Sequence, residues 1–440
     1  MNEANLLLVL CGIALFSLFS GPISRSNITP PLAFAGLGVL LSPIVLGWIN
    51  LGSDHAAIHL IAEITLILVL FTDAARINLK SLWSDHDVPV RLLLVGMPLT
   101  IIAGTLLAQW LLPELLLIET IVLAIILAPT DAALGQAVVS SPKVPNRIRQ
   151  TLNVESGLND GIALPALLFV ISFAASTHSG EHDTNWLSFV MLQITLGPVA
   201  GITVGWLGAK AINMAIERGY LTREFCNIYL LSLAFIAYLA ADLIGGNGFI
   251  AAFSAGVAVG NTLKHVNEEI YEFAESEGQL LNLVIFFLFG LSLLPQVWSH
   301  ITLPVVTYAL LSLTVIRMIP VFIALLGKHL RWETTLFLGW FGPRGLASIL
   351  FVLLVLEHAN LLHQSLVFDT VIVTVAFSIV LHGITALPGV NAYAAALKNC
   401  EIRGDNLSSE QQTVSEMPLR LPANLDTSSL KQNDDDASKA

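Results

Sequence analysis

Long apolar stretches recur along almost the whole chain, and they constrain its fold more than any other feature. Of the 440 residues, 55% are apolar and only 12% are charged, whereas a soluble domain carries about 25% charged residues. A run of about 20 apolar residues is long enough to cross a bilayer. Because only helices and closed barrels satisfy their backbone groups in lipid, and barrel strands alternate, the sequence predicts an all-α polytopic membrane protein.

Thirteen of these stretches are expected to form transmembrane helices. They are Leu6–Phe19, Pro31–Ile49, Ile58–Ala75, Leu92–Leu112, Thr120–Val139, Leu152–Ala174, Phe189–Ile212, Phe225–Ile244, Phe249–Leu263, Leu280–Leu294, Ile301–Leu326, Thr334–Leu356 and Val367–Leu387. The first is interpreted as a retained span and not as a signal peptide, because no basic region precedes it.

The basic residues agree with this count. Of the 20 lysines and arginines, all but Arg317 and Arg344 lie in every second connection or after the last span, with Lys210, two residues before the end of its span, counted with the connection that follows. By the positive-inside rule, this alternation predicts an N-terminus outside the cell and a C-terminus in the cytoplasm. The acidic stretch Lys264–Gln279 lies on the same cytoplasmic side. It is read as a solvated connection, with a cation funnel or a pH-sensing surface as the alternative.

Three further observations bound the class of protein. Residues 388–440 follow the last span and become polar and rich in Ser, Asp and Gln, so a disordered cytoplasmic tail is expected there. Cys11, Cys226 and Cys400 form no metal-ligand or redox pattern and are expected to be bystanders. The formal net charge of −12 gives no reason to expect nucleic acid as a partner.

Two spans carry a proline beside a charged residue in mid-span: Pro129 and Asp131 in the fifth, Pro343 and Arg344 in the twelfth. Proline removes a helix hydrogen bond and clashes with the preceding turn, so both helices are expected to be broken. The spans lie seven apart and therefore run in opposite directions. Paired interruptions predict two inverted six-helix repeats, spans two to seven and eight to thirteen. Where the two breaks cross, the partial positive charge of facing helix N-termini would stabilise Asp131, and the partial negative charge of facing C-termini would stabilise Arg344. The alternative is two ordinary proline kinks.

The sixth span carries an unusual concentration of polar residues. Glu155 and Asn159 share one helical face, and Ser156 and Asp160 form the adjacent pair. An ionisable group in a span costs roughly 2.5–3.5 kcal/mol on insertion scales, so it indicates a functional site. Small hard cations prefer oxygen ligands. The expected ligands of a sodium ion are Asp160, Asp131, Ser156 and Thr130.

A single carboxylate is enough to run an exchanger. Burial favours the protonated form of a carboxyl group and a nearby cation favours the ionised form, so proton and cation compete for the same oxygens. If only the loaded forms cross between inward-open and outward-open states, the two ions exchange. This role is assigned to Asp160, and the neutral Asn159 beside it adds no second titratable charge.

Glu155 in span six and Arg317 in span eleven raise a shared problem, because neither charge is stable alone at that depth. A buried ion pair between them is the expected solution, and the loss of one partner would be strongly destabilising. A structural clamp is the favoured interpretation of Glu155, with direct ion ligation as the alternative.

Other polar residues in the spans receive structural interpretations. Asp73 and Arg76 are expected to pair near the inner end of span three. Glu63 and Asp242 lie toward the outer ends of their spans, as entrance or packing residues. His382 is interpreted as a satisfied histidine at the inner membrane interface.

The P-T-D of span five, the E-S-G-L-N-D-G of span six and the G-P-R-G of span twelve resemble the NhaP-type and eukaryotic sodium/proton exchanger branch of the monovalent cation/proton antiporters. The resemblance covers roughly Leu6 to Leu387. It implies thirteen helices, elevator-type alternating access and a homodimer. Within one antiporter domain over residues 1–387, it implies a core of about 92–174 and 301–387 and a dimerisation scaffold of about 1–75 and 189–294.

The resemblance also carries expectations for individual residues. It implies an ion site at Asp160, Asp131, Thr130, Ser156 and Glu155, with Arg317 paired to Glu155 and Arg344 compensating the crossing. The pair Asn159–Asp160 resembles the electroneutral branch, which exchanges one cation for one proton; the electrogenic branch has two aspartates there. One departure bears on Asp131 and Thr130, because Ala132 follows Asp131 where family members usually have proline.

The leading hypothesis is therefore an electroneutral sodium/proton antiporter of a prokaryotic inner membrane. It is not an enzyme, it needs no cofactor, and sodium ions and protons are its substrates. A potassium- or lithium-handling antiporter is the alternative within the class. A cation channel and an intramembrane aspartyl protease are alternatives outside it; paired broken helices argue against the first, and the absence of a G-x-G-D motif around Asp131 and Asp160 argues against the second.

Overall fold

The computed structural model describes residues 28–49, 55–85, 87–131, 133–178, 186–263, 268–359, 361–403, 406–412 and 414, with a few single positions between 7 and 18. These residues form helices, turns and irregular connections, and no strand occurs among them. The predicted all-α class is confirmed. Ala132 and most of the first predicted span lie outside the described residues.

The first half of the chain contains α2 (Pro30–Leu41), α3 (His55–Ala75), α4 (Leu79–Asp85), α5 (Asp87–Arg91), the π-helix η1 (Leu92–Gly96), α6 (Met97–Leu111), α7 (Leu117–Ile126), α8 (Gln136–Val139), α9 (Asn146–His178) and α10 (Trp186–Glu217). The second half contains α11 (Arg223–Leu243), α12 (Gly248–Thr262), α13 (Glu268–Leu288), the π-helix η2 (Phe289–Leu293), α14 (Leu294–Val297), the 3-10 helix η3 (Trp298–His300), α15 (Leu303–Leu313), α16 (Val315–Leu325), α17 (Trp332–Trp340), α18 (Leu346–His358) and α19 (Gln364–Ile402).

Each predicted span from the second to the thirteenth coincides with one or more of these helices. Among the described residues, seven helical stretches are long and apolar enough to cross a membrane: Asp87–Leu111, Asn146–Ala174, Met191–Glu217, Phe225–Leu243, Gly278–His300, Leu303–Leu325 and Gln364–Ile402. Four shorter apolar helices accompany them: Pro30–Leu41, Leu117–Ile126, Gly248–Thr262 and Leu346–Glu357. The chain is a multi-pass membrane protein, while the total of thirteen spans stays a prediction.

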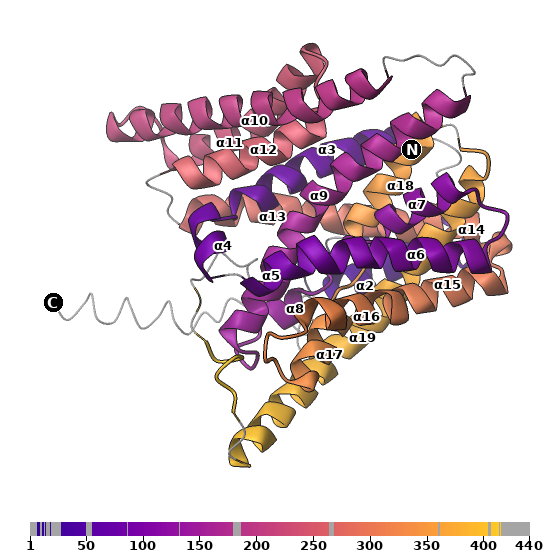
Figure 1. Ribbon diagram of the computed structural model, residues 1–440. Helices are drawn as coiled ribbons and strands as arrows, with labels where there is room; N and C mark the ends of the chain where they lie inside the picture. The colour runs from indigo at the N-terminus through magenta and orange to yellow at the C-terminus, as the bar shows by residue number, and fades with distance from the viewer. Residues whose placement is uncertain are drawn as a thin grey trace.

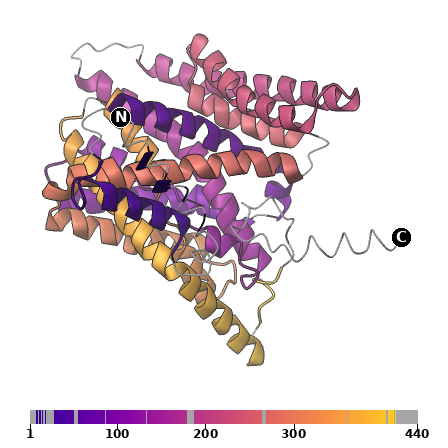
Figure 2. The same ribbon diagram turned by 180° about the vertical axis from the view of Figure 1, so that it is seen from behind.

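The helices lie in layers. In Figure 1, α10, α11 and α12 form one layer at the top of the view, with α3, α9 and α13 below it. Helices α6, α15, α16 and α19 lie on the opposite side of the bundle. Figure 2 shows the same layers from behind, and in both views the C-terminal part of α19 extends beyond the other helices.

The layer containing α10 and α12 is packed unusually tightly. A Cβ added at Gly201 or Gly205 of α10 would collide with the backbone of Ala251 or Ala255 of α12. A Cβ at Gly256 of α12 would collide with the carbonyl oxygen of Phe71 of α3. Since glycine lets helix backbones approach closely in membranes, α3, α10 and α12 form one closely joined unit.

One predicted span boundary is wrong. Span two was expected to run to Ile49, but α2 ends at Leu41, where Ser42 Oγ donates to the carbonyl of Val39 at 2.7 Å and Pro43 follows. A proline disfavours the helical conformation of the residue before it, so the chain turns there. The acidic stretch from Glu268 onward is helical, as the start of α13; its first residues, 264–267, lie outside the described residues.

The disordered tail expected from residue 388 begins too early. Helix α19 continues through Pro388 to Ile402, because the segment after the proline is rich in helix-favouring alanine and buries Val390 and Tyr393. Leu407 and Glu410 are also buried, so residues 406–412 pack against the bundle. Residues 415–440 lie outside the described residues.

Candidate functional site

Both predicted helix interruptions are present, and they contact each other. The fifth span breaks between Ile126 and Gln136, and the twelfth between Trp340 and Leu346. The N–H of Asp131 donates to the carbonyl of Pro343 at 2.8 Å. Ser348 Oγ, in the first turn of α18, donates to the carbonyl of Ile126, the last residue of α7, at 2.8 Å. The two breaks therefore form a crossing, with Pro129 and Pro343 in its non-helical segments.

The Asp131 carboxylate joins the two sides of this crossing. Its Oδ2 accepts the N–H of Leu346, the first residue of α18, at 2.7 Å, and its Oδ1 accepts the N–H of Ala133 at 2.7 Å. A negative charge is stabilised at a helix N-terminus, where unpaired N–H groups carry partial positive charge. A Cβ at Gly345 would collide with this carboxylate, so glycine is required for the contact.

Arg344 lies in the same crossing and is fully buried. Its Nη1 donates to the carbonyl of Gly342 at 2.7 Å, just beyond the end of α17, and its N–H donates to Ser378 Oγ of α19 at 2.7 Å. Among the described residues, its Nε and Nη2 have no hydrogen-bond partner. The guanidinium therefore places a positive charge beside a helix C-terminal end, the arrangement expected for it.

His382 lies next to Arg344 inside the bundle, and its expected depth at the inner membrane interface stays a prediction. It is 1% exposed, with Nε2 at 2.9 Å from the carbonyl of Trp340 and Nδ1 at 3.0 Å from the carbonyl of Ser378. The sequence placed His382 near the end of its span, but α19 runs on for five more turns of about 3.6 residues. The prediction that its nitrogens are satisfied is confirmed.

A hydrogen-bonded polar cluster joins the fifth span to α9. Thr130 Oγ1 lies 3.0 Å from Ser156 Oγ, and Asn159 Nδ2 donates to Thr130 Oγ1 at 2.7 Å. All three residues are buried. Asn159 Oδ1 is also buried, and among the described residues it has no hydrogen-bond partner. Asp160 follows Asn159 on α9 and is half-buried.

This cluster is built of oxygens and not of transition-metal ligands. Among the described residues, no group of three or more His, Cys, Asp or Glu side chains is arranged to hold a metal ion. A cation here would therefore depend on hydroxyl, amide and carbonyl oxygens together with a carboxylate. Buried oxygens normally have a donor, so Asn159 Oδ1 is an acceptor that the described residues leave unused.

The structure brings Glu155 and Arg317 together. Arg317 Nη2 of α16 lies 2.6 Å from Glu155 Oε1 of α9, and the two side chains are 2% and 4% exposed. Glu155 Oε2 has no hydrogen-bond partner among the described residues. A Cβ at Gly342 would lie 2.6 Å from Arg317 Nε, so the guanidinium also packs against the break between α17 and α18. The pair therefore links α9 to the crossing.

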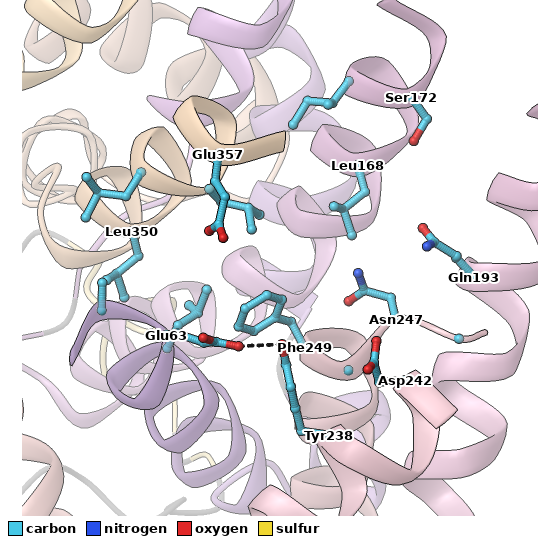
Figure 3. Close-up of a pocket in the computed structure, with 17 residues that line it drawn as sticks. Glu63, Leu168, Ser172, Gln193, Tyr238, Asp242, Asn247, Phe249, Leu350 and Glu357 are labelled. Carbon is cyan, nitrogen blue, oxygen red and sulfur yellow. Dashed lines mark hydrogen bonds between the residues drawn. The ribbon is translucent and has the colours of Figure 1, made fainter. Parts of the chain in front are cut away.

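A cavity of about 400 Å³ opens at the predicted outer side of the bundle (Figure 3). Its walls come from α9 and α18 on one side and from α3, α10, α11 and α12 on the other. The carboxylates of Glu63, Asp242 and Glu357 line it, and Tyr238 OH donates to Glu63 Oε1 at 2.6 Å. The positions of Glu63 and Asp242 agree with entrance residues, whereas Glu357 and Tyr238 were missed, because sequence does not show which helices face each other.

A much smaller cavity lies near the opposite end of α3. Asp73 and Arg76 line a cavity of only about 20 Å³, together with residues of α13. The predicted pairing of their side chains stays a prediction. Glu63 and Asp73 are ten residues apart on α3, which is about 15 Å along a helix axis. The two cavities thus lie at different depths along the same helix, and the larger one is on the predicted outer side.

Two charged networks outside the spans' centres were not predicted from the sequence. Asp87 Oδ1 lies 2.9 Å from Arg147 Nη2, and Asp87 Oδ2 lies 2.7 Å from Lys328 Nζ. At the other end of the bundle, the fully buried Glu119 accepts the N–H of His363 at 2.7 Å and lies 2.9 Å from His363 Nδ1. The signal in both cases was a charge next to a span end, but the partners lie 60 and 241 residues away in the first case and 244 in the second.

The sequence matches a family of known proteins over most of its length. The family model described as "Sodium/hydrogen exchanger, transmembrane" matches residues 7–392. The protein named "K(+)/H(+) antiporter NhaP2" from Shewanella sp. (strain ANA-3) is 25% identical over 340 residues, which are 77% of this chain and 58% of that protein. The protein named "Na(+)/H(+) antiporter 2" from Zygosaccharomyces rouxii is 29% identical over 334 residues, which are 71% of this chain and 41% of that protein. This chain spans less than two thirds of the length of these relatives.

A solved structure has the same fold. The sodium proton antiporter MjNhaP1 from Methanocaldococcus jannaschii at pH 8 superimposes with a TM-score of 0.71, covering 89% of this chain and 97% of that chain. The sequence identity is 22%, so the similarity concerns the fold.

Proposed function

Because this chain belongs to the transmembrane sodium/hydrogen exchanger family, whose members are transporters and not enzymes, we propose that it exchanges a monovalent cation for a proton across a prokaryotic plasma membrane. Family membership confirms the resemblance seen in the motifs of spans five, six and twelve. The activity itself is a proposal, because the curated relatives extend well beyond the matched part of this chain.

The observation that carries the proposal is the buried oxygen cluster beside Asp160. Thr130, Ser156 and Asn159 are held in one hydrogen-bonded group at the helix crossing, and the buried Asn159 Oδ1 lacks a donor among the described residues. Oxygen atoms fixed in this way suit a hard monovalent cation. The half-buried Asp160 supplies the negative charge that a cation or a proton can neutralise.

The proposed mechanism uses one carboxylate. Asp160 binds either a cation, together with Thr130, Ser156 and Asp131, or a proton. Since each ion neutralises the same charge, only one is bound at a time, and exchange is one for one. Asn159 is neutral and contributes an oxygen without a second charge. Glu155 is held by Arg317 in this account and acts as a clamp.

Sodium is the proposed cation, and potassium is the second candidate. The names of the relatives favour neither alone, since the Shewanella protein is named a potassium/proton antiporter and the Zygosaccharomyces protein a sodium/proton antiporter. The oxygen ligands are compatible with both. No further cofactor enters the proposal.

The proposed transport motion is an elevator-type displacement of a core against a scaffold. The core comprises about 92–174 and 301–387, and the scaffold about 1–75 and 189–294. The outer cavity supports this division, because α9 and α18 of the core form one wall and α3, α10, α11 and α12 of the scaffold form the other. We also propose two inverted six-helix repeats, a homodimer joined through the scaffold, an N-terminus outside and a C-terminus in the cytoplasm.

Proton flux in sealed proteoliposomes tests the proposal. Liposomes carrying an outward pH gradient receive sodium, potassium or lithium in turn, with and without a clamped membrane potential. The account predicts proton flux that starts on addition of sodium and is indifferent to the potential. Flux with potassium but not with sodium would make potassium the transported cation. Flux that follows the membrane potential would contradict one-for-one exchange. The absence of flux with all three cations would contradict the proposed function.

A further inference from the structure

The outer cavity ends above the polar cluster. Its lining includes Phe249 of α12, Leu168 of α9 and Leu350 of α18, and it does not include Asp160 or Thr130. Leu168 and Asp160 are eight residues apart on α9, which corresponds to about 12 Å along the helix. The lining of the cavity therefore stops about two helical turns short of Asp160 on α9.

Phe253 lies one helical turn beyond the cavity lining on α12. It lies four residues after Phe249 on α12, so it projects from the same helical face one turn deeper. Its ring lies against Gly161 of α9, the residue that follows Asp160. A Cβ at Gly161 would lie 2.5 Å from Cε2 and 2.6 Å from Cε1 of this ring, so a side chain at this position would push the ring away.

The two sides of this contact differ in how they are held. Helix α12 is tightly joined to α10 and α3, since Gly205 and Gly256 bring these backbones into direct contact. Phe253 therefore projects from a fixed frame. Gly161, in contrast, presents bare backbone to the ring. A ring on a bare backbone can shift along the helix without the withdrawal of interlocked side chains.

We propose that the Phe253 ring, seated on Gly161, is the seal between the outer cavity and Asp160, and that the core slides past this ring during transport. An apolar constriction excludes water and hydrated ions by dewetting. Phe253 is thus a positioning residue that decides when Asp160 is reached from the outer side. This inference rests on the proposed function and adds the residue that keeps the two ion movements coupled.

A four-variant cycle tests the steric contact. Gly161→Ala places a methyl group against the ring, Phe253→Ala removes the ring, and the double variant has the methyl group without the clash. Thermal stability in detergent and the initial rate of cation-driven proton flux are measured for the wild type and all three variants. We expect Gly161→Ala to lower the melting temperature and to slow exchange about tenfold or more, and the double variant to recover a large part of both losses.

The seal itself is tested by proton flux without a transported cation. Phe253→Ala liposomes are expected to lose a pH gradient several-fold faster than wild-type liposomes, whereas Phe249→Ala liposomes retain it. Phe249→Ala is the matched control, because it removes the same ring from the same face of α12 without touching Gly161.

These results separate the two claims. Gradient retention in Phe253→Ala equal to wild type, or no recovery in the double variant, would overturn the seal. The wild type could also show no cation-driven flux while the double variant recovers the stability lost in Gly161→Ala. The Phe253–Gly161 contact would then be correct, but the proposed function and the seal that rests on it would both be wrong.

Discussion

The Asp131 carboxylate accepts the backbone N–H of Leu346 at 2.7 Å, which joins the break in the fifth span to the first residue of α18 in the twelfth. The same carboxylate accepts the N–H of Ala133, on its own side of the break. One acid thus satisfies backbone donors on both broken helices. This makes Asp131 part of the frame that holds the polar cluster, in addition to its proposed contact with the cation.

The first prediction follows from this contact. Asp131→Ala removes acceptors from two buried N–H groups, and losing a helix N-cap costs about 0.5–2 kcal/mol. Asp131→Asn keeps one acceptor oxygen and should therefore lose less stability than Asp131→Ala. Thermal unfolding in detergent measures the order of stability, which should be wild type, then Asn, then Ala. An Ala variant as stable as the wild type would contradict the framing role.

The second prediction concerns the buried pair of Glu155 and Arg317, whose charged atoms lie 2.6 Å apart. Removing one partner leaves an unpaired buried charge, which costs about 3–5 kcal/mol. Arg317→Met should therefore fold poorly, while the double variant Glu155→Leu/Arg317→Met should recover much of the lost stability. Yield of folded protein and melting temperature measure both effects.

The same double variant separates the two interpretations of Glu155. If Glu155 serves only to pair with Arg317, the folded double variant should retain cation-driven proton flux. A folded double variant without flux would instead make Glu155 a ligand of the cation.

The third prediction concerns the C-terminal segment. Glu410 is 1% exposed, and its Oε1 accepts the N–H of Arg331 at 2.8 Å and Thr334 Oγ1 at 3.1 Å, at the start of α17. Leaving such buried donors unsatisfied costs about 1–3 kcal/mol. Glu410→Ala should lower the melting temperature, whereas Glu401→Gln, at an exposed position on α19, should not. Equal melting temperatures for the two variants would show that the segment does not stabilise the bundle.

The spans and the crossing were predictable because their signals are local. An apolar membrane helix normally excludes both proline and charged residues. Pro129 with Asp131 in the first half of the chain and Pro343 with Arg344 in the second half are exceptions to both rules. A buried charge also needs a partner of opposite charge, which leaves few candidates among apolar spans. Glu155 and Arg317 are opposite charges in separate spans, so the sequence alone suggests that they meet.

Other features have no local signal. The break at Thr314 between α15 and α16 and the π-helical turns η1 and η2 fall on residues that are neither proline nor charged. The outer cavity depends on which faces of six helices meet, and Phe253 on α12 looks like any core phenylalanine in the sequence. The continuation of α19 past Pro388 depends on the burial of Tyr393 against the bundle, which is a tertiary effect.

The central claim is that the Asp160 carboxylate carries cation and proton in turn, and the Asp160→Asn variant tests it most directly. Proton flux on addition of sodium and of potassium is measured in sealed proteoliposomes, beside wild type and Glu114→Gln, which removes an exposed acid between α6 and α7. The account predicts no cation-driven flux from Asp160→Asn at a melting temperature close to that of the wild type, and full flux from Glu114→Gln. Flux from Asp160→Asn at the wild-type rate would contradict it.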